Sequence, residues 1–142
     1  MKRFLLNNGS EYSYEQLLAS LNESDKYYLL YKQLDLYLFF VNLIKALANN
    51  APLVLLDADL NETEIDGVNV AEINVPTKIV STTFVNMEAV VEAVKNSTSE
   101  ITIFTSGTTG QPKKVVHCVQ TLMRAVRNGK KYINQVWAYA YN

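Results

Sequence analysis

The residues best suited to chemistry gather in one short segment, residues 101–115. An apolar stretch, 101–104, runs directly into a loop of hydroxyl residues and glycines that Pro112 and Lys113 close. Glycines let backbone N–H groups turn toward an anion, and Ser and Thr hydroxyls add further donors. Lys113 supplies a mobile positive charge. The pattern predicts a strand followed by a phosphate-binding loop.

A P-loop of the Walker type does not fit this segment. That motif needs two glycines five positions apart, with Lys and Ser or Thr after the second one, at the start of a helix. Here Gly107 and Gly110 are only three positions apart, and the lysine follows Pro112. Val115 and Val116 then favour a strand rather than a helix. The loop therefore belongs to a different class of phosphate binder.

The sequence Thr-Ser-Gly-Thr-Thr-Gly-Gln-Pro-Lys at residues 105–113 resembles the core phosphate-binding motif of the adenylate-forming enzymes. This family includes acyl- and aryl-CoA ligases, amino-acid adenylation domains and luciferase-like proteins. All nine positions are in register. The family usually has Gly after the lysine, where this chain has Lys114. By this resemblance, residues 1–142 are expected to be a single truncated N-terminal portion of an AMP-binding domain, with its phosphate-binding loop at 104–114.

The resemblance implies an acid–thiol ligase of the acyl-CoA synthetase type. Such enzymes convert a carboxylic acid and ATP to an acyl-adenylate and pyrophosphate, and then pass the acyl group to coenzyme A or to a carrier-protein thiol. Donors aimed at the charge that builds on pyrophosphate lower the barrier. In this chain the implied ATP phosphate-binding residues are Thr105, Ser106, Gly107, Thr108, Thr109, Gly110 and Lys113.

Other parts of that family's machinery are missing from the sequence. There is no Tyr-Gly-x-Thr-Glu motif, whose glutamate holds magnesium, no matching ribose-binding aspartate and no C-terminal catalytic lysine. We therefore assign no catalytic or metal-binding residue, and expect the chain alone not to form acyl-adenylates. The alternative is a stand-alone nucleotide- or phosphate-binding module without catalysis. The identity of the carboxylic acid is not encoded in the motif.

Three further positions have two interpretations each. His117, just past the loop, could line a substrate pocket, but a structural role is favoured because no partner is visible in sequence. Asp57 and Asp59 could bind a metal or act as acid and base, although such residues are common in turns at strand ends. Cys118 is better explained as a small packed residue than as a nucleophile.

Composition narrows the class of protein. A hydrophobic content of 49% and a charged content of 19% over 142 residues predict one globular domain. The net charge of −1 argues against nucleic acid as a partner. A single cysteine permits no internal disulfide, and no secretory signal is present, so a cytoplasmic location is expected. The longest apolar stretch, 36–47, contains Asn42 and Lys45, and is too short and polar to span a membrane.

The first half of the chain predicts the elements that would support the loop. Residues 4–6 favour a short strand, with a turn at 7–9, and Ser13 and Gln16 form a capping-box pattern before a helix. Apolar spacing predicts a helix over 35–49. The apolar run 52–56 then predicts a strand buried on both faces. Together they predict an α/β fold, a layered sheet with flanking helices, as in the N-terminal part of the large domain of an adenylate-forming enzyme.

The second half continues this alternation. Short or edge strands are expected at 69–71 and 73–76, a helix at 86–94 with Met87, Val90, Val91 and Val94 on one face, and a polar link at 96–99. A strand at 115–119 would pair with 101–104 in a hairpin that holds the loop. Thr121 would cap a last helix, with Leu122, Ala125 and Val126 inward, before an alternating aromatic strand at 136–141. Because a chain rarely stops within such a strand, a longer parent enzyme is expected, and the exposed edge could form a dimer.

Overall fold

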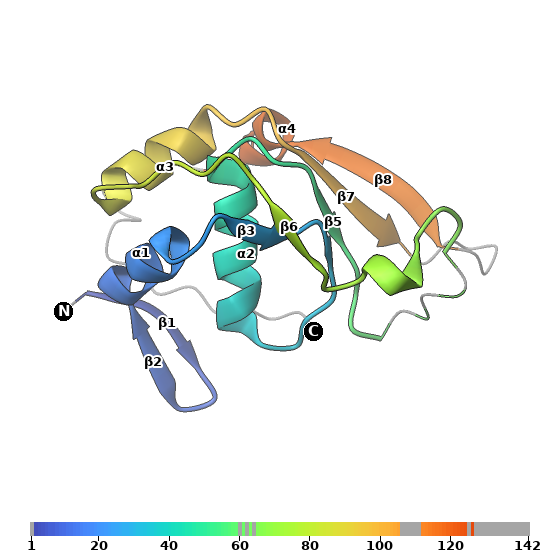
Figure 1. Cartoon of the computed structure of the whole chain (residues 1–142), viewed down its shortest axis with the longest axis horizontal. Coiled ribbons are helices and arrows are strands. Elements are labelled where there is room, and N and C mark those ends of the chain that lie inside the picture. The colour runs from blue at the N-terminus through green and yellow to red at the C-terminus, as the bar shows by residue number, and fades with distance from the viewer. Residues whose placement is uncertain are drawn as a thin grey trace.

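The largest sheet has four strands in the order β4–β5–β7–β8 (Figure 1). These are β4 (Leu30–Tyr31), β5 (Leu53–Leu55), β7 (Glu100–Thr105) and β8 (Lys113–Cys118). The first three are parallel, and β8 runs antiparallel to β7. The computed structural model describes residues 2–59, 61, 63, 65–105, 112–124 and 126. The prediction of a mixed α/β fold is confirmed.

Helix α2 (Leu36–Ala48) connects β4 to the parallel strand β5. Its start is set by Asp35, whose carboxylate accepts a hydrogen bond from the Leu38 N–H at 2.9 Å, and Asn49 caps its end. This confirms the helix expected at 35–49. Figure 1 shows α2 between the sheet on one side and helices α1 and α3 on the other.

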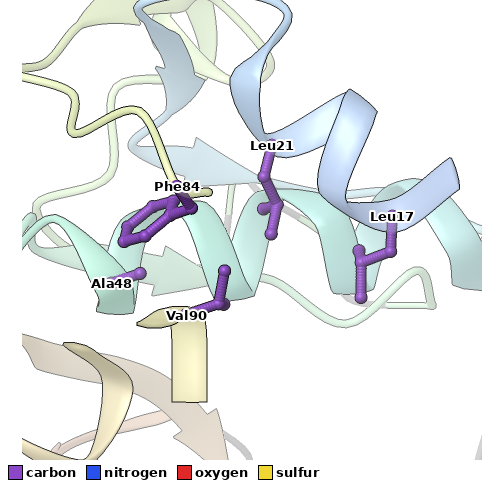
Figure 2. Close-up of a cluster of buried hydrophobic side chains, with 5 residues drawn as sticks. All are labelled: Leu17, Leu21, Ala48, Phe84 and Val90. Carbon is purple, nitrogen blue, oxygen red and sulfur yellow. The ribbon is translucent and has the colours of Figure 1, made fainter. Parts of the chain in front are cut away.

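A cluster of buried side chains joins the three longer helices α1 (Tyr14–Asn22), α2 and α3 (Met87–Lys95). Figure 2 shows these side chains, which are Leu17, Leu21, Ala48, Phe84 and Val90. A second group, with Leu53 at its centre, fills the space between α2 and the sheet. On the other face of the sheet, Leu30 and Leu56 pack against Ile65. The central strand β5 is therefore covered on both faces, as its continuous apolar sequence predicts.

An N-terminal hairpin precedes α1. Strand β1 (Arg3–Asn7) pairs with β2 (Ser10–Ser13), and the turn uses positive φ angles of 49° at Asn8 and 81° at Gly9. Asn-Gly is the preferred pair for such a two-residue turn. The expected capping box is present: the Gln16 N–H donates to the Ser13 hydroxyl, and the Ser13 N–H donates to the Gln16 side chain. Strand β2 was not expected.

The segment 68–80 differs from the sequence prediction. Val70–Glu72 forms a 3₁₀-helix rather than a strand, because the Asn69 side chain accepts a hydrogen bond from the Ala71 N–H and turns the chain. Ile73 makes only an isolated bridge to Leu30. The strand begins later: β6 (Pro76–Lys78) pairs with β3 (Lys26–Tyr28) in a separate two-stranded sheet. Pro76 is tolerated because it is the first residue of the strand.

Other corrections concern burial and one helix start. Val91 is exposed rather than inward, while Ser97 and Ser99 of the expected polar link are buried and bonded to each other. Helix α4 (Val119–Met123) starts two residues before Thr121, whose hydroxyl contacts the Cys118 Sγ atom instead of capping. Its buried residue is Val119, and Leu122 and Val126 are exposed.

Ala125 and the expected strand at 136–141 lie outside the described residues. Within the part of the chain that the structure describes, no helix has both the length and the apolar character needed to cross a membrane.

Candidate functional site

Strands β7 and β8 hold together the two ends of the loop that carries the motif at residues 105–113, which we call the motif loop. The predicted hairpin is confirmed, and its last pair before the loop joins Thr105 to Lys113. Both residues are exposed, so a ligand in solution can reach them. The positions in between, Ser106, Gly107, Thr108, Thr109, Gly110 and Gln111, lie outside the described residues. What the fold establishes is that the loop starts and ends at one defined edge of the sheet.

That edge is the one at which the parallel strands β4, β5 and β7 all end. In open α/β sheets, ligands bind in the crevice outside the carboxyl ends of the strands. A cavity of about 540 Å³ lies there, which we call the carboxyl-edge cavity. Its volume falls within the range of about 300–1,000 Å³ that is typical of small-molecule sites. Tyr31, Leu55 and Ile103 bring one side chain from each of the three strands to its wall.

The wall of the cavity continues into the start of α2 and into the turn after β5. Leu36 and Phe39 contribute apolar surface from α2, and Phe104 lies next to Thr105 at the start of the loop. The N-terminus of a helix carries a partial positive charge, which here faces the carboxylate of its cap, Asp35. The cavity therefore combines an apolar wall with a few polar groups, and the phosphate motif begins at its margin.

Tyr31 was not identified from the sequence, and is the most unusual polar residue of the cavity. Its side chain is only 4% exposed, and its hydroxyl makes no hydrogen bond to any of the described residues. Burial raises the pKa of Tyr31 to about 12, with smaller contributions from Tyr28 and Asp35. No buried side-chain oxygen or nitrogen of the described residues lacks a hydrogen-bond partner, so the Tyr31 hydroxyl oxygen is itself reached by solvent. Because Tyr31 lines the cavity, its hydroxyl can donate to a bound ligand. Only its place at the end of a parallel strand could have drawn attention to it.

Asp57 and Asp59 also line the carboxyl-edge cavity, after β5. The Asp59 N–H donates to the Asp57 carboxylate at 3.1 Å, which is the local hydrogen bond of an Asx-turn. Both residues are exposed. Among the described residues, no group of three or more His, Cys, Asp or Glu side chains could hold a metal ion. The geometry accounts for the pair as a turn at the end of a strand.

His117 lies far along β8 from the loop. It pairs with Ile101, four residues after Lys113, and a strand rises about 3.4 Å per residue, so some 14 Å of strand separates the two positions. It is half-buried and does not line the carboxyl-edge cavity. The structure therefore does not bring His117 together with the loop residues.

Cys118, next to His117, is half-buried at the end of the strand. Its Sγ atom lies 2.9 Å from the Thr121 hydroxyl. Hydrogen bonds from the side chain and backbone of Thr121 lower the pKa of the Cys118 thiol. Its half-buried position agrees with the small, partly buried packing role expected from sequence.

A scan against protein-family models and searches of curated proteins and of solved structures found no match to this chain. The resemblance to adenylate-forming enzymes therefore rests on the nine-residue motif alone.

Proposed function

We propose that this chain is the phosphate-binding N-terminal portion of an adenylate-forming enzyme of the acyl-CoA ligase type. The parent activity would join a carboxylic acid to ATP with magnesium, release pyrophosphate, and transfer the acyl group to the thiol of coenzyme A. The observation that carries the proposal is the sequence at 105–113, which follows a strand of a parallel sheet and ends on a paired antiparallel strand.

Under this proposal the loop binds the β- and γ-phosphates of ATP. Gly107 and Gly110 would allow the backbone to approach the phosphates, and the hydroxyls from Thr105 to Thr109 would donate to their oxygens. Lys113 would pair with the charge that grows on pyrophosphate as the carboxylate attacks the α-phosphate. The exposure of Thr105 and Lys113 at the sheet edge supports these roles.

The carboxyl-edge cavity supports the proposal from a second direction. A nucleotide whose phosphates lie on the loop needs space for its organic part, and the cavity reaches Phe104, the residue before Thr105. The proposed family relation also supplies the finer description of the fold, in which β4, β5, β7 and β8 would belong to the sheet of the large N-terminal domain.

The test is calorimetric titration of Mg–ATP into the chain and into the double variant Ser106→Ala, Lys113→Ala. We expect weak binding to the unaltered chain and at least about tenfold weaker binding to the variant, since hydrogen bonds to charged groups contribute about 1.5–3 kcal/mol. Pyrophosphate should compete with ATP, and AMP should not, because the loop would hold the β- and γ-phosphates.

Lys114→Ala is the matched control, since it removes the neighbouring positive charge outside the nine-residue motif. Equal weakening by Lys114→Ala would indicate nonspecific attraction and contradict the proposed role of Lys113. Absence of binding to the unaltered chain would contradict a preformed phosphate loop.

The second candidate function is a stand-alone phosphate- or nucleotide-binding module. It requires only the phosphate-binding loop at 104–114, which the sequence contains. Both candidates predict loss of ATP binding in the double variant, and acyl-adenylate chemistry by the full-length protein separates them.

A further inference from the structure

Lys45 is a buried lysine in the middle of the molecule. It lies on α2, and its residue is only 4% exposed. Its Nζ atom donates to the Ser24 carbonyl oxygen at 3.1 Å and lies 3.5 Å from the Ser24 hydroxyl. An ammonium group has three donors. One N–H donor of the Lys45 ammonium therefore remains beyond those that the two neutral oxygens of Ser24 can accept.

No carboxylate of the described residues forms an ion pair with Lys45. Glu23 and Asp25 are its nearest acidic influences, and burial outweighs them in lowering the pKa of Lys45. Buried charges in proteins are normally paired, because removal from water is costly. Lys45 thus has acidic residues nearby but no ion-pair partner among the described residues.

The side chain borders a second cavity of about 270 Å³, which we call the Lys45 cavity. Among the described residues, its charged lining residues are Lys45, Lys26 and Glu23, and Asp25 also acts electrostatically on Lys45. Tyr28 and Tyr31 also line it, with their rings stacked at 5.5 Å. The volume is just below the range of about 300–1,000 Å³ for drug-sized ligands, so a smaller molecule would fit.

We propose that the Lys45 cavity binds a small organic acid, with the carboxylate on the Lys45 ammonium and the organic part against the Tyr28–Tyr31 pair. A carboxylate would supply the ion-pair partner that Lys45 lacks among the described residues. The inference does not use the motif loop, and it stands independently of the proposed function.

A purely structural role explains Lys45 less well. Ser24 is exposed, so its carbonyl could hydrogen-bond to water without the lysine. A methionine would fill a similar volume on α2 without burying a charge, and such replacements are often neutral or stabilising. Lys45→Met is therefore expected to fold.

The test is a titration of the ¹⁵N-labelled chain with benzoate, followed by amide resonances, with benzamide as the uncharged control ligand. We expect saturable shifts at Tyr28 and Asn42 with benzoate and none with benzamide. Lys45→Met should weaken benzoate binding by about tenfold or more. Lys95→Met, which changes an exposed helical lysine, should leave binding unchanged.

A second measurement needs no change at Lys45. Benzoate binding should weaken as the pH rises and Lys45 loses its proton. The other groups around Lys45 that could contribute are Glu23, Asp25, Lys26, Tyr28 and Tyr31. If Lys26→Gln binds benzoate with the same pH midpoint as the unaltered chain, titration of Lys26 does not cause the pH dependence.

The inference would be overturned by equal binding of benzamide and benzoate, or by unchanged benzoate binding in Lys45→Met. It would also be overturned if neither benzoate nor hexanoate gave saturable shifts up to about 10 mM, which is tenfold above a weak millimolar Kd. Each can occur whether or not Mg–ATP binds, so failure here is distinct from failure of the proposed function.

Discussion

Buried tyrosines show how differently one residue type can be used in this protein. Tyr37 is buried, and its hydroxyl lies 2.9 Å from that of Ser20 while its ring stacks on Tyr12. Tyr31 is buried to a similar degree, but its hydroxyl has no such partner and borders both cavities. Because no buried polar side-chain atom of the described residues lacks a partner, the unbonded Tyr31 hydroxyl must reach solvent through these cavities. It is therefore open to a ligand in either one.

Tyr31 also predicts how stability depends on alkaline pH. Its pKa is raised from 10.0 to about 12 in the folded protein, so the unfolded state loses this proton first. The resulting stabilisation is complete below pH 10 and is lost as the pH rises toward 12, by up to about 3 kcal/mol. The free energy of unfolding, measured by urea denaturation followed by circular dichroism, should decline less steeply over this pH interval in Tyr31→Phe. Parallel curves for the two proteins would contradict the assignment.

At the scale of the elements, asparagine side chains act as strand partners. Asn42 accepts from the Tyr28 N–H at 2.8 Å and donates to the Tyr28 carbonyl at 3.0 Å. Asn22 makes the same paired contact with Phe84, and Asn74 with Lys32. In each case a side-chain amide supplies the two bonds that a neighbouring strand would. These contacts connect segments that have no ladder between them, and Asn42 attaches β3 to α2.

Loss of one such contact should weaken the fold measurably. Asn42→Ala leaves the N–H and the carbonyl of Tyr28 without partners beside a buried position, so we expect a decrease of about 2–4 kcal/mol in the free energy of unfolding. Urea denaturation measures the decrease. Asn96→Ala is the control. Asn96 makes its contacts on the exposed surface of α3, so its replacement should lower the free energy of unfolding much less. Equal losses in the two variants would show that the Tyr28 contact is not stabilising.

At the scale of the whole molecule, the parallel strands bring distant sequence segments to one edge. The ends of β4, β5 and β7, the start of α2 and the start of the motif loop all meet at the carboxyl-edge cavity. The Lys45 cavity shares Tyr31 and Gln33 with it. The two cavities are therefore neighbours.

Under the proposed function, this arrangement would supply one part of an adenylation site. Because the sequence has no Tyr-Gly-x-Thr-Glu motif, we expect purified chain to release no pyrophosphate from ATP when carboxylic acids are added. A coupled pyrophosphate assay with a panel of short, long and aromatic acids measures this, and a known acyl-CoA ligase serves as the positive control. Carboxylate-dependent release that is lost in Lys113→Ala would show that the chain holds a complete site.

Local patterns in the sequence determined the elements whose causes are local. The Asn8–Gly9 turn, the Ser13–Gln16 capping box and the hairpin around the motif loop all follow from neighbouring residues, and the structure confirms them. Competing local signals also led to wrong predictions. Val70–Glu72 became a 3₁₀-helix through a local side-chain turn that competes with strand propensity, and Thr121 does not cap α4.

Asn42 and Lys45 illustrate what only the tertiary structure decided. In the sequence they are polar interruptions of an apolar stretch, which argues against a membrane span and says nothing more. In the fold both are 4% exposed. One finds its partners in β3, and the other borders a cavity and forms no ion pair with any described residue. The sequence by itself determined the motif and the strands that hold it. Which polar groups are buried, and beside which cavities, depends on contacts between segments far apart in the chain, and no local pattern encodes those.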